Sequence, residues 1–340
     1  MSTSWSIVAT AKESTILLSS FIAHHLSLGA DAIYLYLDDA REDQYELFSC
    51  IPSVNVFLCN EEYWASRSLN RPVDHRHRQV ANANHALGLC RSEWICHIDV
   101  DEYIMPPQPI SQILDDCDDQ VVIMKPAENY FSKKPESVRD LLTSSFHLPF
   151  PRYKEGRKYR REIGKWCEAC SNGLQGHMAG KVFLRKGTGL RLNIHEAIPK
   201  EKISSKLESD IILLHFFSLG YSDWLSKNLR RMDPYRLEGV AKWKRKKLDL
   251  FFEALKSKDR DNQLLWLFED ALVYNGKKEE RLKEYAGVIY NDLNLEGKVG
   301  EVFGDKEQLS FDKPLSNIKG NIDIDEEMYK IALRSIESVI

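Results

Sequence analysis

Three carboxylates follow directly after an apolar run in the first third of the chain. The run Trp94–Ile98 leads into Asp99, Asp101 and Glu102. In an extended segment Asp99 and Asp101 point to the same side, so their oxygens can share one hard divalent cation, while Glu102 points the other way. Such a cation would bridge a diphosphate. The structural alternative is a solvated acidic turn that caps the next element.

The elements that would position these carboxylates alternate between two patterns. Runs rich in β-forming residues alternate with apolar residues at helical spacing, and this predicts an α/β fold with a mostly parallel sheet flanked by helices. Ligands bind such sheets beyond the carboxyl ends of the strands. The runs are residues 5–10, 33–37, 54–58 and 94–98 for strands, and 16–28 and 76–89 for helices; the residues that follow strands are Lys12, Glu13, Asp38, Asp39 and 99–102.

The second half of the chain has a different pattern. The alternation is lost after residues 121–125, and residues 129–180 show no clear period, which is typical of a functional loop. Residues 181–185 and 211–217 are predicted as further strands. From residue 221 the pattern is helical through about residue 290, with a last helix at 325–339. We therefore predict two domains, an α/β domain over 1–220 and an α-helical region over 221–340.

Composition limits the classes of protein and partner. The 340 residues include 47 Lys and Arg against 51 Asp and Glu, a net charge of -4, so no whole-protein field attracts nucleic acid. The N-terminus lacks the pattern of a secretory signal, and no window approaches about 18 uninterrupted apolar residues. These features predict a soluble, cytoplasmic protein.

Seven cysteines suggest no disulfide framework, because most lie in apolar runs where reduced thiols are usual. Cys167 and Cys170 form one CxxC with His177 nearby. A structural zinc site needs four ligands at matched spacing, so we interpret this pair as packing or loop thiols.

Four segments together resemble a known family of enzymes. They are Ala11-Lys12-Glu13 with His24–Ala30, the strand Ile33–Asp38, the helix start Arg78-Gln79 with Asn82 and Asn84, and Ile98–Tyr103. Their order and spacing resemble the glycosyltransferase family 2-like group, which has the GT-A fold and a DxD motif, and its relatives in family 92. The resemblance covers residues 5–125 well and extends loosely to His215-Phe216-Phe217, Ser222 and Lys227.

The resemblance implies transfer of a sugar from a nucleotide diphosphate sugar, UDP by default, to a glycan or lipid-linked acceptor. It implies Mn2+ or Mg2+ held directly by Asp101, with Asp99 on the ribose or on a metal-bound water. Lys12, Glu13 and Asp38 would line the nucleotide pocket, and Arg78 with Gln79 would meet the base or a phosphate. Residues 1–220 would then be the catalytic GT-A domain.

Enzymes of this type recruit a late histidine as a further metal ligand. Two histidines fit, and we favour His195 because it follows a turn beside Glu196, whereas His215 lies in a strongly apolar strand.

Inverting transfer also needs a carboxylate base beside the acceptor. Glu128, Glu162 and Glu196 are open candidates, and Glu196 joins Asp101 and Glu102 as a predicted catalytic residue.

Nine Lys or Arg residues lie within 227–247 beside aromatic residues. A basic aromatic helix over 227–252 can contact an anionic membrane, here the inner face, or hold an anionic acceptor. The alternative is a solvated helix face.

Two rival functions remain at this stage. A nucleotidyltransferase also binds metal through paired aspartates, but it would be expected to have a glycine-rich, basic phosphate-binding loop after the first strand. Here that loop is Ala11-Lys12-Glu13-Ser14, which is acidic and has no glycine. A non-catalytic module that binds through its basic helix is disfavoured, because it would keep three neighbouring carboxylates without a cation to offset their charge.

Overall fold

The computed structural model describes residues 3–151, 154–170, 172–176, 178–231, 242–317, 324 and 326–337. Within them the chain forms two compact units. The first unit comprises Met1–Pro126, Ala179–His215 and Leu293–Ser310, and the second comprises Ala127–Met178, Phe216–Asp292 and Phe311–Ile340. The segment 127–178 thus groups with the C-terminal helices. The domains predicted from the sequence, 1–220 and 221–340, are each continuous along the chain, whereas each unit of the structure combines three separate stretches.

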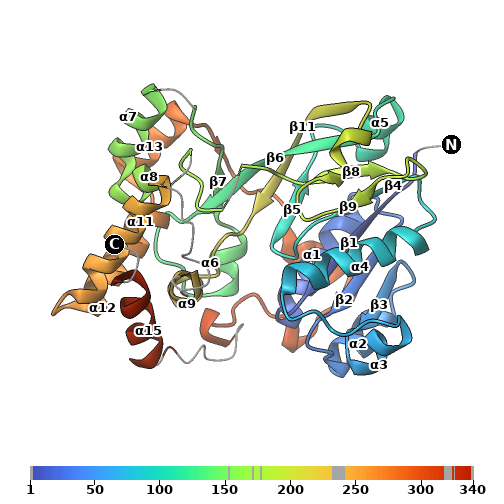
Figure 1. Cartoon of the computed structure of the whole chain (residues 1–340), viewed down its shortest axis with the longest axis horizontal. Helices are drawn as coiled ribbons and strands as arrows, with labels where there is room; N and C mark the ends of the chain where they lie inside the picture. The colour runs from blue at the N-terminus through green and yellow to red at the C-terminus, as the bar shows by residue number, and fades with distance from the viewer. Residues whose placement is uncertain are drawn as a thin grey trace. The chain divides into compact units, whose positions relative to one another are not determined.

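The first unit contains the strands and helices that begin the chain (Figure 1). Its elements are β1 (Trp5–Ala11), α1 (Thr15–Ser27), β2 (Ala32–Leu37), α2 (Glu42–Ser49), β3 (Val54–Leu58), α3 (Glu61–Ser66), α4 (His75–Leu89), β4 (Trp94–His97), β5 (Glu102–Met105), α5 (Ile110–Asp115), the start of β6 (Val121–Tyr130), β8 (Val182–Arg185), β9 (Arg191–Leu192), β10 (Ala197–Ile198), a 3-10 turn (Lys200–Lys202), β11 (Lys206–His215), α14 (Leu295–Phe303) and a second 3-10 turn (Glu307–Leu309).

The sheet of the first unit combines parallel and antiparallel pairing. Strand β1 pairs in parallel with β2 and β4, and β2 pairs in parallel with β3. Strand β8 pairs antiparallel with β4 and β6, and β11 pairs antiparallel with β5. The α/β class and the parallel strands are therefore confirmed. The carboxyl ends of β1, β2 and β4 lie at one edge, which brings the residues after Ala11, Leu37 and His97 to that edge.

Helix α4 covers one face of this sheet and builds a core against it. Val8, Tyr36 and Ile95 of the strands are buried with Ala83 and Ala86 of the helix. The Asp74 side chain begins the helix by accepting a hydrogen bond from the backbone N–H of Arg76 at 2.9 Å.

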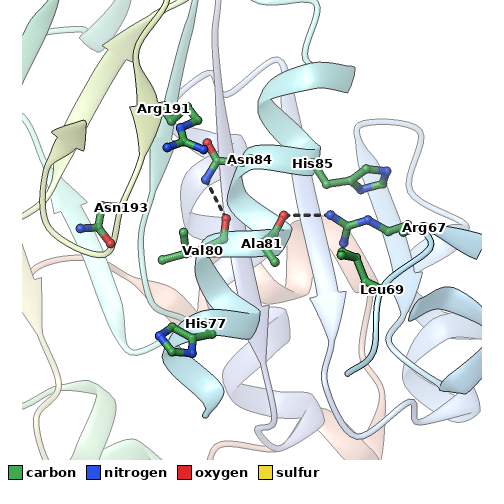
Figure 2. A pocket seen from close by; sticks show the side chains of 9 residues that line it. All are labelled: Arg67, Leu69, His77, Val80, Ala81, Asn84, His85, Arg191 and Asn193. Carbon is green, nitrogen blue, oxygen red and sulfur yellow. Dashed lines mark hydrogen bonds between the residues drawn. The ribbon is translucent and has the colours of Figure 1, made fainter. Parts of the chain in front are cut away.

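Asn84 fastens α4 to strand β9. Its Nδ2 donates to the Val80 carbonyl at 2.8 Å (Figure 2). The same Nδ2 donates to the Leu192 carbonyl at 2.8 Å, and Oδ1 accepts from the Leu192 N–H at 3.1 Å. Strand β9 is therefore fixed on the helix.

The second unit is mostly helical, as the sequence predicts for residues after 221. Its elements are the end of β6, α6 (Val138–Leu142), β7 (Ser145–His147), α7 (Lys154–Ile163), α8 (Lys165–Ala169), α9 (Tyr221–Arg231), α11 (Lys242–Lys256), α12 (Arg260–Leu272), α13 (Gly276–Tyr285), β12 (Val288–Ile289), a 3-10 turn (Leu315–Asn317) and α15 (Glu326–Glu337). Within the described residues, no helix is both long and apolar enough to cross a membrane.

The segment predicted as an irregular functional loop contributes scaffold to this unit. Residues 129–170 include α6, β7, α7 and α8, and Trp166 of α8 packs against Trp224 with ring centroids 5.2 Å apart. The prediction was wrong here because this segment gains its order from contacts with distant helices, which local periodicity does not record.

The CxxC cysteines lie in the same unit. Cys167 and Cys170 are buried free thiols, and Cys167 packs in a cluster with Tyr130, Phe150 and Tyr274. His177 lies outside the described residues, so the interpretation of this pair stays a prediction.

Candidate functional site

A tight turn joins β4 to β5 and carries the three carboxylates. The Glu102 N–H donates to the Asp99 carbonyl at 3.0 Å, and the Glu102 side chain accepts from the Asp99 N–H at 2.8 Å. The extended path expected from the sequence is interrupted here, because the turn takes up Val100 and Asp101. Asp99 and Asp101 consequently meet different partners.

A buried lysine, Lys181, holds Asp99 and Glu102. Its Nζ lies 2.8 Å from Asp99 Oδ2 and 3.4 Å from Glu102 Oε2, and its side chain is 0% exposed. Gln79 of α4 donates to the other oxygen of Asp99 at 2.6 Å. Two carboxylates and one ammonium thus form a charged cluster in which Lys181 and Glu102 are buried and Asp99 is 30% exposed, and each acid has a cation to offset its desolvation.

The electrostatics of this cluster follow from burial and from Lys181. Burial lowers the pKa of a lysine, but the charges of Asp99 and Glu102 outweigh burial and raise the pKa of Lys181. Burial opposes ionisation of Asp99, yet Lys181 holds the pKa of Asp99 below its usual range. Burial raises the pKa of Glu102 to about 7, with Lys181 acting in the opposite direction. The lysine and Asp99 are therefore charged at neutral pH.

Gly180 sets the position of Lys181. Its φ of +60° lies in the left-handed region, and a Cβ there would clash with the carbonyl oxygen of Met124. The Gly180 carbonyl lies 3.1 Å from Nδ1 of His195, so that ring nitrogen donates to it. His195 therefore lies beside the residue that precedes Lys181.

Asp101 faces the other candidate histidine, His215. His215 pairs with Glu102 in the β5–β11 register, and its Nε2 lies 3.7 Å from Asp101 Oδ2. Both side chains are partly exposed, at 29% for Asp101 and 24% for His215. The sequence favoured His195 because His215 lies in an apolar strand, but His215 is the last residue of that strand, where its neighbours no longer bury it.

The pair Asp101–His215 fits a divalent ion. An ion about 2.1 Å from each ligand requires that the two atoms lie within about 4.2 Å of each other, and they do. In the described part of the chain, no group of three or more His, Cys, Asp or Glu side chains could hold a metal. One or two carboxylates are nevertheless usual for Mg2+ sites that substrate phosphates complete, and Asp101 is such a carboxylate, with the His215 imidazole as a further nitrogen ligand.

Two histidines of α1 fasten the strand that follows Asp101. His24 Nε2 donates to the Ile104 carbonyl at 2.8 Å, and His25 Nε2 accepts from the Ile104 N–H at 3.3 Å. His25 Nδ1 in turn donates to the Phe21 carbonyl at 2.8 Å. The two imidazoles thus bond β5 as a neighbouring strand would. Sequence reasoning gave them no role, although two adjacent histidines on an apolar helix are a signal of buried hydrogen bonding.

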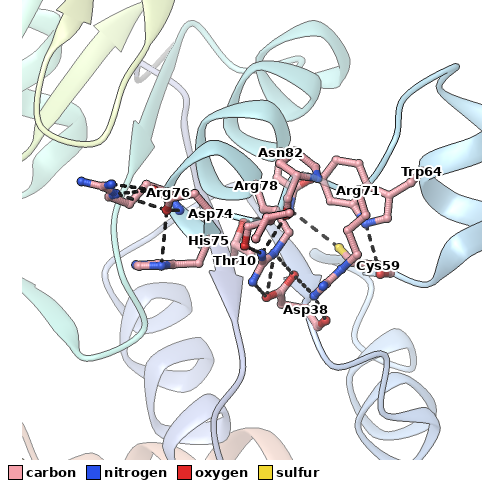
Figure 3. A network of polar contacts seen from close by, with 12 residues as sticks. Thr10, Asp38, Cys59, Trp64, Arg71, Asp74, His75, Arg76, Arg78 and Asn82 are labelled. Carbon is pink, nitrogen blue, oxygen red and sulfur yellow. Dashed lines mark hydrogen bonds and ion pairs between the residues drawn. The ribbon is translucent and has the colours of Figure 1, made fainter. Parts of the chain in front are cut away.

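Asp38, at the end of β2, is held by two arginines (Figure 3). Arg78 binds it through Nε at 2.8 Å and Nη2 at 2.7 Å, and Arg71 lies 3.1 Å away. Arg78 also donates to the carbonyls of Pro72 and Val73. This bidentate pair ties the loop before α4 to the carboxyl end of the sheet.

The remaining predicted residues of the nucleotide pocket follow β1. Lys12 is exposed and Glu13 is half-buried, and the Glu13 carbonyl accepts from Nε2 of Gln44 at 2.8 Å. Both lie at the edge of the sheet that also carries Asp38 and Asp99.

The three candidates for the catalytic base have different surroundings. Glu196 lies in the first unit and pairs with Lys200 at 2.6 Å. Glu128 and Glu162 belong to the second unit, where Glu128 accepts the N–H groups of Gln175 and Gly176 at 2.5 and 2.6 Å. Glu162 accepts from the Tyr285 hydroxyl at 3.0 Å.

The sequence profile of glycosyltransferase family 92 matches residues 9–249 of this chain. The chain belongs to glycosyltransferase family 92. This match spans both units and includes every candidate residue described above. It identifies the protein as a glycosyltransferase, a sugar-transferring enzyme, and so decides against the nucleotidyltransferase and the binding module.

Several solved structures are similar in part to this family 92 chain. S. aureus TarS, residues 1–349, has 12% identity over 83% of this chain and 82% of that chain, with a TM-score of 0.35. HddC from Yersinia pseudotuberculosis has 11% identity over 55% and 78%, with a TM-score of 0.29. The galactosyltransferase LgtC, in complex with donor and acceptor sugar analogs, has 15% identity over 53% and 57%, with a TM-score of 0.25. Because these TM-scores are low, the assignment rests on the family match.

No curated protein matches the chain significantly.

Proposed function

We propose that this glycosyltransferase takes a sugar from a nucleotide diphosphate sugar, UDP by default, in a reaction that depends on Mn2+ or Mg2+. The observation that carries the proposal is the Asp101–His215 pair, 3.7 Å apart where β5 begins and β11 ends. A divalent ion at this pair would act as a Lewis acid that offsets the charge developing on the leaving diphosphate. Asp101 and His215 would hold it.

The buried cluster behind this pair supports its geometry. Lys181 and Gln79 fix Asp99, and the Glu102 carboxylate closes the turn that carries Asp101. A carboxylate held by a buried ammonium does not swing, so the turn presents Asp101 in one position. We propose that Asp99 positions the site and contacts the ribose of the donor.

The nucleotide would lie along the carboxyl edge of the sheet. Asp38 is fixed by Arg78 and Arg71 and lies after β2, while Lys12 and Glu13 follow the neighbouring strand β1. Carboxylates in fixed positions accept N–H and hydroxyl donors of a base and a ribose. We place these residues around the nucleotide.

The acceptor would be a glycan or a lipid-linked glycan, and the transfer would invert the anomeric centre. Glu196 is the base candidate that shares the first unit with Asp101. Its pairing with Lys200 would have to open for it to accept a proton.

A thermal-shift screen tests the proposed donor and metal. UDP-, GDP-, CDP- and dTDP-sugars are each added with and without Mn2+, because a ligand that binds only the folded chain raises Tm by mass action. We expect one nucleotide class to raise Tm in the presence of Mn2+ and much less in its absence. If no nucleotide sugar raises Tm under either condition, the proposal is wrong.

The same screen distinguishes the two histidines. His215→Gln should lose most of the Mn2+-dependent increase, while His195→Gln should retain it. The reverse result would assign the ion to His195, as the sequence alone suggested.

A further inference from the structure

A cavity of about 510 Å3 opens on the outer face of α4. Six polar side chains surround it: Arg67, His77, Asn84, His85, Arg191 and Asn193 (Figure 2). The other lining residues are apolar, and no carboxylate is among them. The chain as a whole carries a net charge of -4, so this pocket is a local positive site on an acidic protein.

Neither arginine of the pocket is neutralised within the described residues. Arg67 donates only to neutral acceptors, namely the Tyr63 hydroxyl, Asn82 Oδ1 at 3.3 Å and the Ala81 carbonyl at 3.1 Å. A guanidinium has five N–H donors, so two remain for a ligand. Arg191 is exposed and has no ion pair in the described part of the chain. By contrast, the nearby Arg78 is bound bidentately by Asp38.

A neutral donor, His85, also lines the pocket. His85 Nδ1 is 2.8 Å from the Tyr36 hydroxyl, and burial followed by the charge of Arg67 lowers the pKa of His85. Burial also raises the pKa of Tyr36, so its hydroxyl keeps its proton and can donate to Nδ1. Nε2 of His85 then carries the ring proton as a donor.

The walls of the pocket are fixed before any ligand arrives. Two hydrogen bonds of the Asn84 amide, both to Leu192, hold α4 to β9, and the third lies within α4. The Asn193 carbonyl accepts from His97 Nδ1 at 3.1 Å, and the Asn193 N–H donates to the Glu196 carbonyl at 2.9 Å. A site built in this way loses little conformational entropy on binding.

The pocket is next to the candidate active site but separate from it. None of Asp38, Asp99, Asp101 or His215 lines it. Successive residues of a helix are rotated by about 100°, so α4 directs Gln79 to Asp99 while Val80 and Ala81 line the cavity. On the other side, Asn193 contacts His97, which lies two residues before Asp99. A ligand here would approach the donor site from the flank of α4.

We propose that this pocket binds a sugar residue of the acceptor that carries a carboxylate or a phosphate. The role of this ligand as an acceptor rests on the proposed function, whereas the binding of a charged sugar rests on the side chains of the pocket. Two arginines without acidic partners suit the planar, bidentate recognition of such anions. The volume is within the roughly 300 to 1,000 Å3 of small-molecule sites and exceeds the need of a bare anion. The side chains of Asn193, His77 and His85 offer hydrogen bonds to hydroxyls.

Titration calorimetry on the full chain tests the proposal with four probes: glucuronate, glucose 6-phosphate, glucose and inorganic phosphate. We expect at least one charged sugar to bind, glucose not to bind, and inorganic phosphate to bind more weakly than the sugar phosphate. Arg191→Gln should lower the affinity for the charged sugar at least tenfold. Raising the salt to 500 mM should lower that affinity in the wild type as well, because exposed charge contacts are screened.

Arg91→Gln is the matched control, since Arg91 is an exposed arginine of the same unit outside the pocket. It should leave the affinity for the charged sugar unchanged. The proposal fails if no charged sugar binds, if Arg191→Gln binds it as well as the wild type, if glucose binds equally well, or if inorganic phosphate matches the sugar phosphate. UDP, GDP, CDP and dTDP are each titrated with Mn2+ in parallel: the failure of all four to bind would overturn the proposed function, whereas a charged sugar that still depends on Arg191 would keep the pocket assignment.

Discussion

At the scale of single residues, the site depends on one buried cation. Lys181 offsets the charge of Asp99 and contacts Glu102 while its own side chain is inaccessible to water. Charges buried in this way are costly unless each has a partner. Lys181 is therefore the residue whose loss the acidic turn tolerates least.

Substitution of Lys181 by Met should destabilise the fold strongly. Removing one partner of a buried ion pair leaves an uncompensated charge and costs about 3 to 5 kcal/mol in the free energy of unfolding. The measurement is urea unfolding at pH 7. The control Lys200→Met breaks only the partly exposed pair with Glu196 and should cost less than about 1 kcal/mol. Equal effects of the two substitutions would mean that Lys181 does not stabilise the turn.

The sequence predicted some of these residues and missed others. Asp99, Asp101 and Glu102 stand out because three acids after an apolar strand are unusual. Asp38 stands out because it follows a predicted strand, and Arg78 because it lies at the start of a predicted helix. Lys181 was missed, although a lysine that opens the apolar run Val182–Arg185 is itself a signal. Its partners are about 80 residues away, and local pattern does not record that contact.

At the scale of elements, β5 is bonded on one side by β11 and held by two histidines of α1. His24 is flanked by the Lys298 ammonium, whose Nζ lies 3.3 Å from Nδ1, and both rings lie against Tyr103. Burial, with the charge of Lys298, lowers the pKa of His24 to about 3. Burial and the neighbouring His24 likewise lower the pKa of His25. A neutral ring is required where a ring nitrogen accepts a hydrogen bond, as His25 Nε2 does from the Ile104 N–H and His24 Nδ1 does from the Lys298 ammonium.

This pair predicts a loss of stability in mild acid. The unfolded histidines titrate near pH 6.5, while the folded ones stay neutral, so the unfolded state binds more protons as the pH falls below 6.5. Each histidine then removes up to about 1.4 kcal/mol per pH unit from the free energy of unfolding. We expect His25→Gln to be less stable than the wild type at pH 7 but to show a shallower decline between pH 6.5 and 5.

Urea unfolding at three pH values measures this slope. His75→Gln, at an exposed histidine of the same unit, is the control and should keep the wild-type slope. An unchanged slope in His25→Gln would mean that this ring is not held neutral in the fold.

Elements with strong local patterns were predicted well, and the pairing of distant ones was not. The helix predicted at 76–89 is α4 at His75–Leu89, and the strand predicted at 94–98 is β4 at Trp94–His97. The strands predicted at 181–185 and 211–217 are β8 and β11, but their antiparallel pairing and the turn at Val100 and Asp101 escaped prediction. Their geometry follows from long-range partners rather than from alternation along the chain.

At the scale of the whole molecule, lysines of the basic segment 227–252 make contacts within the protein that the sequence did not indicate. Lys246 lies 2.5 Å from Glu168, and Lys247 lies over the Trp166 ring, both within the second unit. Residues 232–241 lie outside the described residues. Contact of residues 227–252 with a membrane or an anionic acceptor stays a prediction. The pocket beside α4 is the second site at which we propose that a negatively charged acceptor binds.

The most direct test of the proposed site is the effect of Mn2+ on UDP affinity in the wild type and in Asp101→Asn. We expect Mn2+ to strengthen UDP binding to the wild type at least tenfold, because Asp101 and the diphosphate would share the ion. Asp101→Asn should abolish that gain with little change in Tm, since Asp101 is partly exposed. The control Asp116→Asn, at an exposed acid of the same unit, should retain it. A full Mn2+-dependent gain in Asp101→Asn would contradict the account.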